Sequence, residues 1–287
     1  MIKNSHSNLN KKPTFFYNQL MLLNFSYKDD SRIAKFPWFF RPLLIIIREI
    51  ISLCIRAKGL FIFPYREGAM ATHHSVAFSE KEKFKEAYRK AVVSFGTMPR
   101  GGVGFRLHQA IWAASSCMKQ DGNFVELGVG TGMTMSAVLN HLGDNWTKSG
   151  KKIFLIDTYS SIVTSPQTGE QNSEESNIAY AKSMDATRQN FREFSNVELI
   201  KGKAPSILKN IEINAISFMH IDLNAAEPEV ESLKFLWKLL TPGAIILLDD
   251  YAYTSRKEQQ VKMDALGVEL GFEVLTLATG QGIIKKQ

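Results

Sequence analysis

The chain has 287 residues, 45% of them hydrophobic and 22% charged, a balance typical of a globular protein that forms its core without disulfides or structural metals. Its two cysteines, Cys54 and Cys117, form no CxxC pair, which argues against a disulfide framework and a zinc site and suits a reducing cytoplasm. The net charge of +7 arises in residues 1–70, which hold 11 of the 35 Lys and Arg, while the remaining residues carry 24 of each sign and do not suggest a nucleic-acid partner.

Residues 1–75 are expected to form a basic, partly helical extension of a domain over residues 76–287. No apolar segment with a cleavage site follows the early lysines, so we expect a cytoplasmic protein. Residues 36–63 are largely apolar, but Arg48 and Glu49 interrupt the run. A membrane-spanning helix needs about 20 largely uncharged residues, which excludes a span here. Two interpretations stay open: a peripheral helix at the inner membrane face, or a helix packed on the domain or on a second subunit of a homo-oligomer.

The domain itself begins with two predicted helices. Ser79-Glu-Lys-Glu82 has the pattern of a capping box and predicts a helix to about Val93, and a second helix is expected over 105–118.

From residue 123 short apolar runs alternate with helical stretches, which predicts a parallel sheet covered by helices on both faces. The expected strands are 123–127, 152–157, 197–201, 216–222, 244–249, 272–278 and 281–286, and the expected helices are 131–142, 173–194, 205–210, 227–240 and 254–270. Only a Thr-Gly-Gln turn separates the last two strands, so they form an antiparallel hairpin. The predicted fold is α/β: a Rossmann-like, doubly wound, mostly parallel seven-stranded sheet that ends in this hairpin and carries an N-terminal helical extension.

A glycine-rich turn follows the first of these strands in Phe124-Val-Glu-Leu-Gly-Val-Gly-Thr-Gly132. Gly128 and Gly130 permit a tight turn with close backbone approach to a ligand, and Gly132 lets the next helix start near the strand. The spacing is GxGxG, not the GxGxxG of nicotinamide-binding proteins. Glu126, two residues before the first glycine, suits a cofactor with a sulfonium and an amino group. The sequence therefore predicts S-adenosylmethionine, with a purely structural turn as the alternative.

Asp157 ends the second predicted strand. A carboxylate there can accept both hydroxyls of a ribose, which is how sugar-bearing cofactors are fixed in this topology. The alternative is a solvated loop carboxylate or a helix cap.

Three aspartates follow two later strands: Asp222 ends one, and Asp249 and Asp250 end the next. Ligands of open α/β sheets bind at the carboxyl ends of the strands, so these side chains are expected to converge near the cofactor. Carboxylates gathered in one cleft repel unless neutralised, and Mg²⁺ takes such oxygen ligands. A bound metal would orient and acidify a substrate hydroxyl while one carboxylate removes the proton. Asp249 or Asp250 could instead cap a helix, and His220 could be catalytic or simply packed and hydrogen-bonded.

The glycine turn, His220-Ile-Asp222 and the stretch from Thr241 to Tyr251 resemble the macrocin O-methyltransferase family, from about residue 97 to the C-terminus. Members are class I S-adenosylmethionine-dependent enzymes that methylate sugar hydroxyls, often on antibiotics or surface glycans. The resemblance implies Mg²⁺ ligands at Asp222, Asp249 and Asp250, and a catalytic base at Asp222.

The chain departs from this family just after Asp222, where Leu223-Asn-Ala-Ala-Glu227 has Asn224 in place of an aspartate and Ala226 in place of a tyrosine. The polar stretch from Tyr159 to Tyr180 is either a lid over the acceptor or an inert loop. The predicted function is Mg²⁺-assisted methyl transfer from S-adenosylmethionine to a hydroxyl of a sugar or glycan precursor. A metal-independent methyltransferase, an NAD-dependent oxidoreductase and a non-catalytic binding protein are the alternatives.

Overall fold

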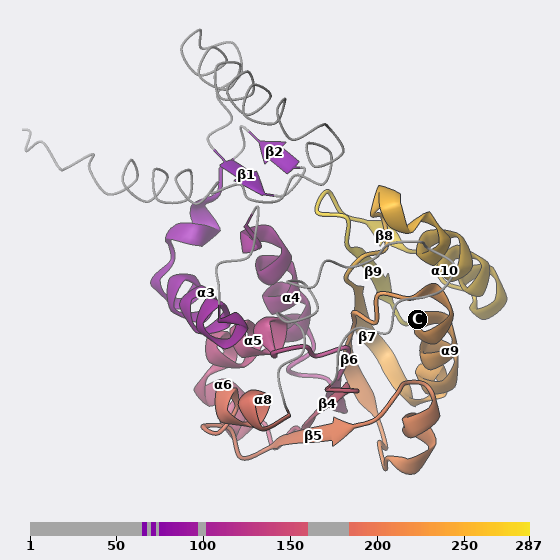
Figure 1. Cartoon of the computed structure of the whole chain (residues 1–287), viewed down its shortest axis with the longest axis horizontal. Helices are drawn as coiled ribbons and strands as arrows, with labels where there is room; N and C mark the ends of the chain where they lie inside the picture. Colours follow the sequence, from indigo (N-terminus) through magenta and orange to yellow (C-terminus); the bar gives the residue numbers. More distant parts are fainter. Residues whose placement is uncertain (1–64, 68–69, 73–74, 97–101, 160–183) are drawn as a thin grey trace, which may run out of the picture. The chain divides into compact units, whose positions relative to one another are not determined.

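The computed structural model describes residues 65–67, 70–72, 75–96, 102–159 and 184–287 (Figure 1). The chain divides into two compact units, Met1–His74 with Arg100–Gly102, and Ser75–Pro99 with Val103–Gln287. In the first unit β1 (Tyr65–Glu67) and β2 (Met70–Thr72) pair antiparallel. The predictions for residues 36–63 and for a lid lie outside the described residues, apart from Tyr159 at the start of the latter. No helix among the described residues is long and apolar enough to cross a membrane.

The second unit is built around a seven-stranded sheet with the order β5-β4-β3-β6-β7-β9-β8. The first five of these strands run parallel, and β9 pairs antiparallel with both β7 and β8. The strands are β3 (Asn123–Leu127), β4 (Ile153–Asp157), β5 (Val197–Lys201), β6 (Ile216–Ile221), β7 (Leu240–Leu248), β8 (Leu275–Thr276) and β9 (Gly282–Lys285). This order and the terminal hairpin confirm the predicted Rossmann-like fold.

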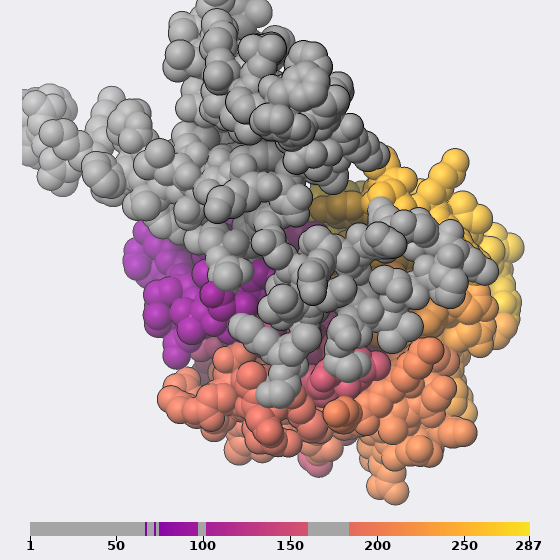
Figure 2. All heavy atoms as spheres, viewed as in Figure 1, coloured from indigo at the N-terminus to yellow at the C-terminus, as the bar shows by residue number. Residues whose placement is uncertain are grey.

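Helices cover both faces of the sheet (Figure 1). On one side lie α3 (Glu82–Phe95), α4 (Gly104–Ser116) and α5 (Met133–Leu142), and on the other α9 (Ala226–Leu236) and α10 (Lys257–Leu270). Two shorter helices are α6 (Asp144–Lys148) and α8 (Met184–Asn190). In the space-filling view the α3 and α10 residues lie at opposite edges of this unit (Figure 2).

Side chains alternate between the two faces of the central strands. Val125 and Met219 belong to the hydrophobic cluster that also contains Leu233 of α9 and Met263 of α10. Phe124 is not in this cluster and packs on Phe218 and Trp146, with ring centroids 5.2 and 5.1 Å apart. Because alternate residues share a face, Glu126 and His220, which are register partners on β3 and β6, lie together on the Phe124 side.

Several local predictions were wrong in detail. Ser79 does not cap a helix: it lies in the 3₁₀ helix Ala77–Glu80, its hydroxyl donates to the Val76 carbonyl, and α3 begins at Glu82 without a side-chain cap. The predicted helix over 205–210 is the 3₁₀ helix Ser206–Asn210, and the predicted strand 272–278 shortens to two residues. Strand β7 begins earlier than expected, at Leu240.

Candidate active site

The glycine turn joins the end of β3 to α5 and is packed directly against the end of β6. Gly128 has a φ of +82°, and a Cβ there would lie 1.9 Å from the Asp222 carbonyl oxygen, so only glycine fits. Gly132, with a φ of +85°, is the N-cap of α5, and a Cβ there would lie 2.4 Å from the Phe191 ring. The turn is thereby held beside Asp222, at the carboxyl edge of the sheet.

Asp157 shapes the glycine turn from the neighbouring strand. Its Oδ2 accepts hydrogen bonds from the backbone N–H groups of Val129 (2.7 Å) and Gly130 (2.8 Å), and its Oδ1 accepts one from the Tyr159 N–H (2.8 Å). With two acceptor sites per carboxylate oxygen, the two backbone bonds use up Oδ2. Oδ1 also lies 3.3 Å from the Thr158 hydroxyl, so a ligand hydroxyl at Oδ1 would take the place of that contact. The ribose contact of Asp157 stays a prediction.

Glu126 is buried beneath the turn, with 1% of its surface exposed. Its Oε1 lies 2.9 Å from His220 Nδ1, whereas its Oε2 is buried and has no hydrogen-bond partner among the described residues. Burial raises the pKa of Glu126, and the nearby His220 partly offsets this. A buried carboxylate oxygen without a partner is costly unless a ligand supplies a donor. The expected amino group of the cofactor would be such a donor.

His220 links Glu126 to the acid cluster. Its Nε2 lies 3.6 Å from Asp249 Oδ1, on the opposite side of the ring from Glu126. Burial alone would lower the pKa of His220, but the neighbouring carboxylates of Asp249 and Glu126 raise it to about 10. The two acids, one on each side of the ring, favour the protonated form of the imidazole. Its contacts are those of a buried, hydrogen-bonded side chain, and a catalytic role for it stays a prediction.

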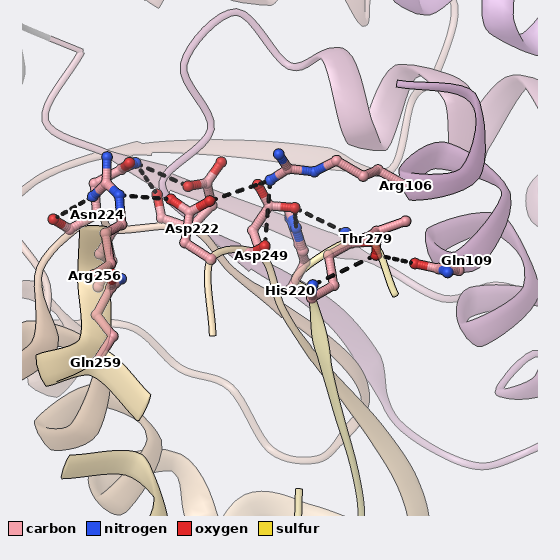
Figure 3. Close-up of polar contacts among 12 residues, drawn as sticks. Arg106, Gln109, His220, Asp222, Asn224, Asp249, Arg256, Gln259 and Thr279 are labelled. Carbon is pink, nitrogen blue, oxygen red and sulfur yellow. Dashed lines mark hydrogen bonds and ion pairs between the residues drawn. The ribbon is translucent and has the colours of Figure 1, made fainter. Parts of the chain in front are cut away.

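The three predicted aspartates follow adjacent strands. Backbone hydrogen bonds extend the ladder past the strand ends: the Asp222 N–H donates to the Leu127 carbonyl (2.8 Å) and the Asp249 N–H to the Ile221 carbonyl (3.0 Å). The sheet thus brings Asp222, Asp249 and Asp250 to one edge, with Asp222 and Asp249 side by side in Figure 3. Burial raises the pKa of Asp222 well above its usual range, and the charges of Asp249 and Asp250 raise it further.

Three side chains that sequence reasoning missed complete the cluster, namely Arg106, Arg256 and Gln281. The Arg106 Nη2 is hydrogen-bonded to Asp249 Oδ2 and lies 3.4 Å from Asp250 Oδ1 (Figure 3). Arg256 Nε lies 3.4 Å from Asp250 Oδ2, and the Gln281 amide donates to Asp249 Oδ1 (2.8 Å).

A sequence signal existed for Gln281 only. The turn between β8 and β9 returns the chain beside β7, and Gly282 pairs with Leu248 at the carboxyl end of that strand. The residue just before β9 must therefore lie close to Asp249. No comparable local pattern marks Arg106 or Arg256.

Asn224 stands at the position where the chain departs from the family pattern. It has a left-handed φ of +57°, and its side-chain amide donates to Asp222 Oδ1 (2.9 Å). Arg256 Nη1 donates to the Asn224 carbonyl (3.0 Å), which ties this loop to the N-terminal end of α10. The loop therefore orients the Asp222 carboxylate.

Comparisons with known proteins agree with this geometry. Residues 125–251 match the sequence profile of a family described as a methyltransferase domain. Among solved structures, the O-methyltransferase NovP is similar with a TM-score of 0.56 and 18% identity, over 70% of this chain and 89% of NovP. CalS11, a calicheamicin methyltransferase, is similar with a TM-score of 0.53 and 12% identity, over 76% of this chain and 99% of CalS11. No curated protein matches the sequence.

Residues 125–251 match a methyltransferase domain, and the sheet order and the glycine turn agree with the fold of class I methyltransferases, the class that uses S-adenosylmethionine. This confirms the predicted enzyme class and argues against the oxidoreductase alternative. Within the class, the chain is similar in fold to NovP and CalS11.

Proposed function

We propose that this chain transfers a methyl group from S-adenosylmethionine to a hydroxyl of a sugar or sugar-containing small molecule. We assign the activity to residues 76–287, with residues 1–75 as an extension. The sugar acceptor rests on the resemblance to the macrocin O-methyltransferase family. The observation that carries the proposal is the unpartnered Oε2 of Glu126, buried beneath a glycine turn that touches the backbone of Asp222.

The cofactor end of the site is formed by β3, β4 and the turn between β3 and α5. Glu126 would accept a hydrogen bond from the amino group of the methionine portion, and Asp157 would bind the ribose. The close approach of Gly128 to Asp222, which directly follows β6, supports a cofactor site next to the acids of the acceptor end.

At the acceptor end, Asp222 would remove the proton. Its Oδ1 is held by Asn224, which leaves Oδ2 to accept the proton of the substrate hydroxyl. A carboxylate with a raised pKa is a stronger base than an exposed one. As the C–S bond breaks, its electron pair stays on sulfur, the hydroxyl oxygen takes the methyl group, and the proton goes to Asp222.

The expected Mg²⁺ does not fit the side chains as they are arranged. Aspartate oxygens are suitable ligands for this ion. Within the described part of the chain, however, no group of three His, Cys, Asp or Glu side chains could hold a metal. Arg106 Nη2 contacts both Asp249 and Asp250, the residues expected to bind such an ion. The proposed step therefore uses protein groups alone.

The test is methyl transfer by the purified chain, followed by mass spectrometry, with a panel of nucleotide sugars and glycosides as acceptors. We expect Asp222→Asn to reduce turnover at least 100-fold, on the order found for loss of a general base, while calorimetry shows unchanged binding of S-adenosylhomocysteine. Asp185→Asn, which changes an exposed aspartate paired with Arg188, is the matched control. Failure of the wild-type chain to bind S-adenosylhomocysteine would overturn the proposal, and so would full activity of Asp222→Asn.

A further inference from the structure

We propose that Arg106 is the resident counter-cation of the aspartate cluster and that methyl transfer by this chain needs no divalent metal. This inference rests on the proposed function. It assigns to Arg106, with help from Arg256, the charge neutralisation that the family resemblance assigns to Mg²⁺.

The oxygens of the two aspartates after β7 are all engaged by donors from the chain itself. Both Asp249 Oδ2 and Asp250 Oδ1 are contacted by Arg106 Nη2. The other oxygen of Asp250 faces Arg256, and the other oxygen of Asp249 accepts a hydrogen bond from Gln281. A metal that used these oxygens would have to displace a guanidinium or an amide from each of them.

The third aspartate is also partly engaged. Asp222 Oδ1 accepts a hydrogen bond from Asn224. We assign the other oxygen of this carboxylate, Oδ2, to the substrate hydroxyl. Asn224 stands where the family pattern has an aspartate. The loop therefore carries one negative charge fewer than the family pattern, so less positive charge is needed to neutralise the cluster.

The charges of the cluster nearly balance without a metal. Asp249 and Asp250 are in contact with two arginines, and Asp249 also lies beside the His220 ring, which it shares with Glu126. A divalent cation added at this point would stand next to two guanidinium groups. Guanidinium groups are suited to this role because they stay charged and donate several hydrogen bonds to carboxylates.

Arg106 is held in place from several directions. It extends from the first turn of α4, its side chain is 21% exposed, and its Cζ lies 5.7 Å from the centroid of the Tyr253 ring. One helical turn further along, Gln109 accepts a hydrogen bond from the Thr279 hydroxyl (2.8 Å), which ties α4 to the turn between β8 and β9 (Figure 3). The same turn supplies Gln281, so one set of contacts positions both donors of Asp249.

The deciding experiment compares cation binding and cation dependence in the wild-type chain and in Arg106→Ala. Binding of Mn²⁺, used as a probe for Mg²⁺, is measured by water-proton relaxation with S-adenosylhomocysteine present, and turnover is measured with EDTA and with added Mg²⁺. We expect wild-type turnover to change less than twofold between EDTA and Mg²⁺, with no saturable Mn²⁺ binding. Arg106→Ala should lose turnover at least tenfold and bind Mn²⁺ at least tenfold more tightly, because two carboxylates lose their donor.

Arg89→Ala is the matched control, since Arg89 is exposed and pairs only with Glu86 of the same helix in the contacts described, and it should behave as wild type. Arg106→Lys retains the charge and should retain weak Mn²⁺ binding, which covers the case in which Arg106→Ala does not fold. Saturable Mn²⁺ binding by the wild-type chain overturns the inference, as does a tenfold loss of turnover in EDTA that Mg²⁺ restores. Because Mn²⁺ binding is measured without an acceptor, it decides the inference even if no acceptor in the panel is methylated.

Discussion

Replacing Gly128 by alanine tests how closely the cofactor turn is packed against the acid-bearing strand. The new Cβ would lie 1.9 Å from the carbonyl oxygen and 2.6 Å from the carbonyl carbon of Asp222, and both are backbone atoms. Carbon atoms in contact are normally about 3.5–4.0 Å apart, so the ends of β3 and β6 would have to separate by about 1.5 Å. The backbone hydrogen bond from Asp222 to Leu127 (2.8 Å) spans this gap and would be weakened or lost.

The magnitude follows from the contributions of strain, lost hydrogen bonding and displaced packing. A non-glycine residue in the left-handed region costs about 1 kcal/mol, and a lost hydrogen bond costs about 1 kcal/mol. Displaced packing around a buried strand end adds about 2 kcal/mol, as for other overpacked sites. We therefore expect Gly128→Ala to lower the free energy of unfolding by about 4 kcal/mol and to weaken binding of S-adenosylhomocysteine at least tenfold.

Urea unfolding followed by circular dichroism gives the first quantity, and calorimetry on the folded protein gives the second. Gly271→Ala is the matched control: Gly271 has a similar φ of +74°, but no atom lies within 4 Å of its added Cβ. Gly271→Ala should lower the free energy of unfolding by about 1 kcal/mol through backbone strain alone, with binding of S-adenosylhomocysteine unchanged. Equal destabilisation by the two substitutions, with cofactor binding intact in both, would refute the close approach of the turn to β6.

Two further predictions concern the core and helix α9. Trp146→Phe removes a buried side chain that donates to Asn196 (2.8 Å) and should lower the free energy of unfolding by about 2 kcal/mol. The 55% exposed Trp112 is the control, and an equal loss in Trp112→Phe would contradict this. Burial raises the pKa of Glu229 to about 8, so between pH 5.5 and 7.5 the folded state keeps a proton that the unfolded state releases. The free energy of unfolding therefore falls by about 1.4 kcal/mol for each pH unit over this range. Glu229→Gln should remove this slope, whereas Glu231→Gln on the exposed side of α9 should keep it; unfolding curves with the wild-type slope in Glu229→Gln would exclude the buried proton.

The positions of four predicted site residues could be worked out from the sequence because each is the last residue of a strand or directly follows one. Parallel strands end at one edge of the sheet, so Gly128, Asp157, Asp222 and Asp249 were expected at that edge, and the structure places all four there. Glycine residues and the alternating pattern of a strand are local signals, which can be recognised from a few consecutive residues.

Contacts between those strands were harder to predict from the sequence. The hydrogen bond between Glu126 and His220 depends on the register of β3 against β6, which the structure shows to shift after Asn123. The capping box at Ser79 failed for a similar reason: a favourable local pattern does not decide whether the chain enters an α-helix directly or through a 3₁₀ turn.

Only the tertiary structure revealed the cations of the site. Arg106 precedes Asp249 by 143 residues and reaches it from a helix that lies on the sheet, and Arg256 arrives from the start of α10. No period or spacing in the sequence encodes such contacts, because they depend on how a helix packs and on which turn of it faces the strand ends. The sequence therefore determined which acids gather at the edge of the sheet, and the packing of α4 and α10 decided which charges neutralise them.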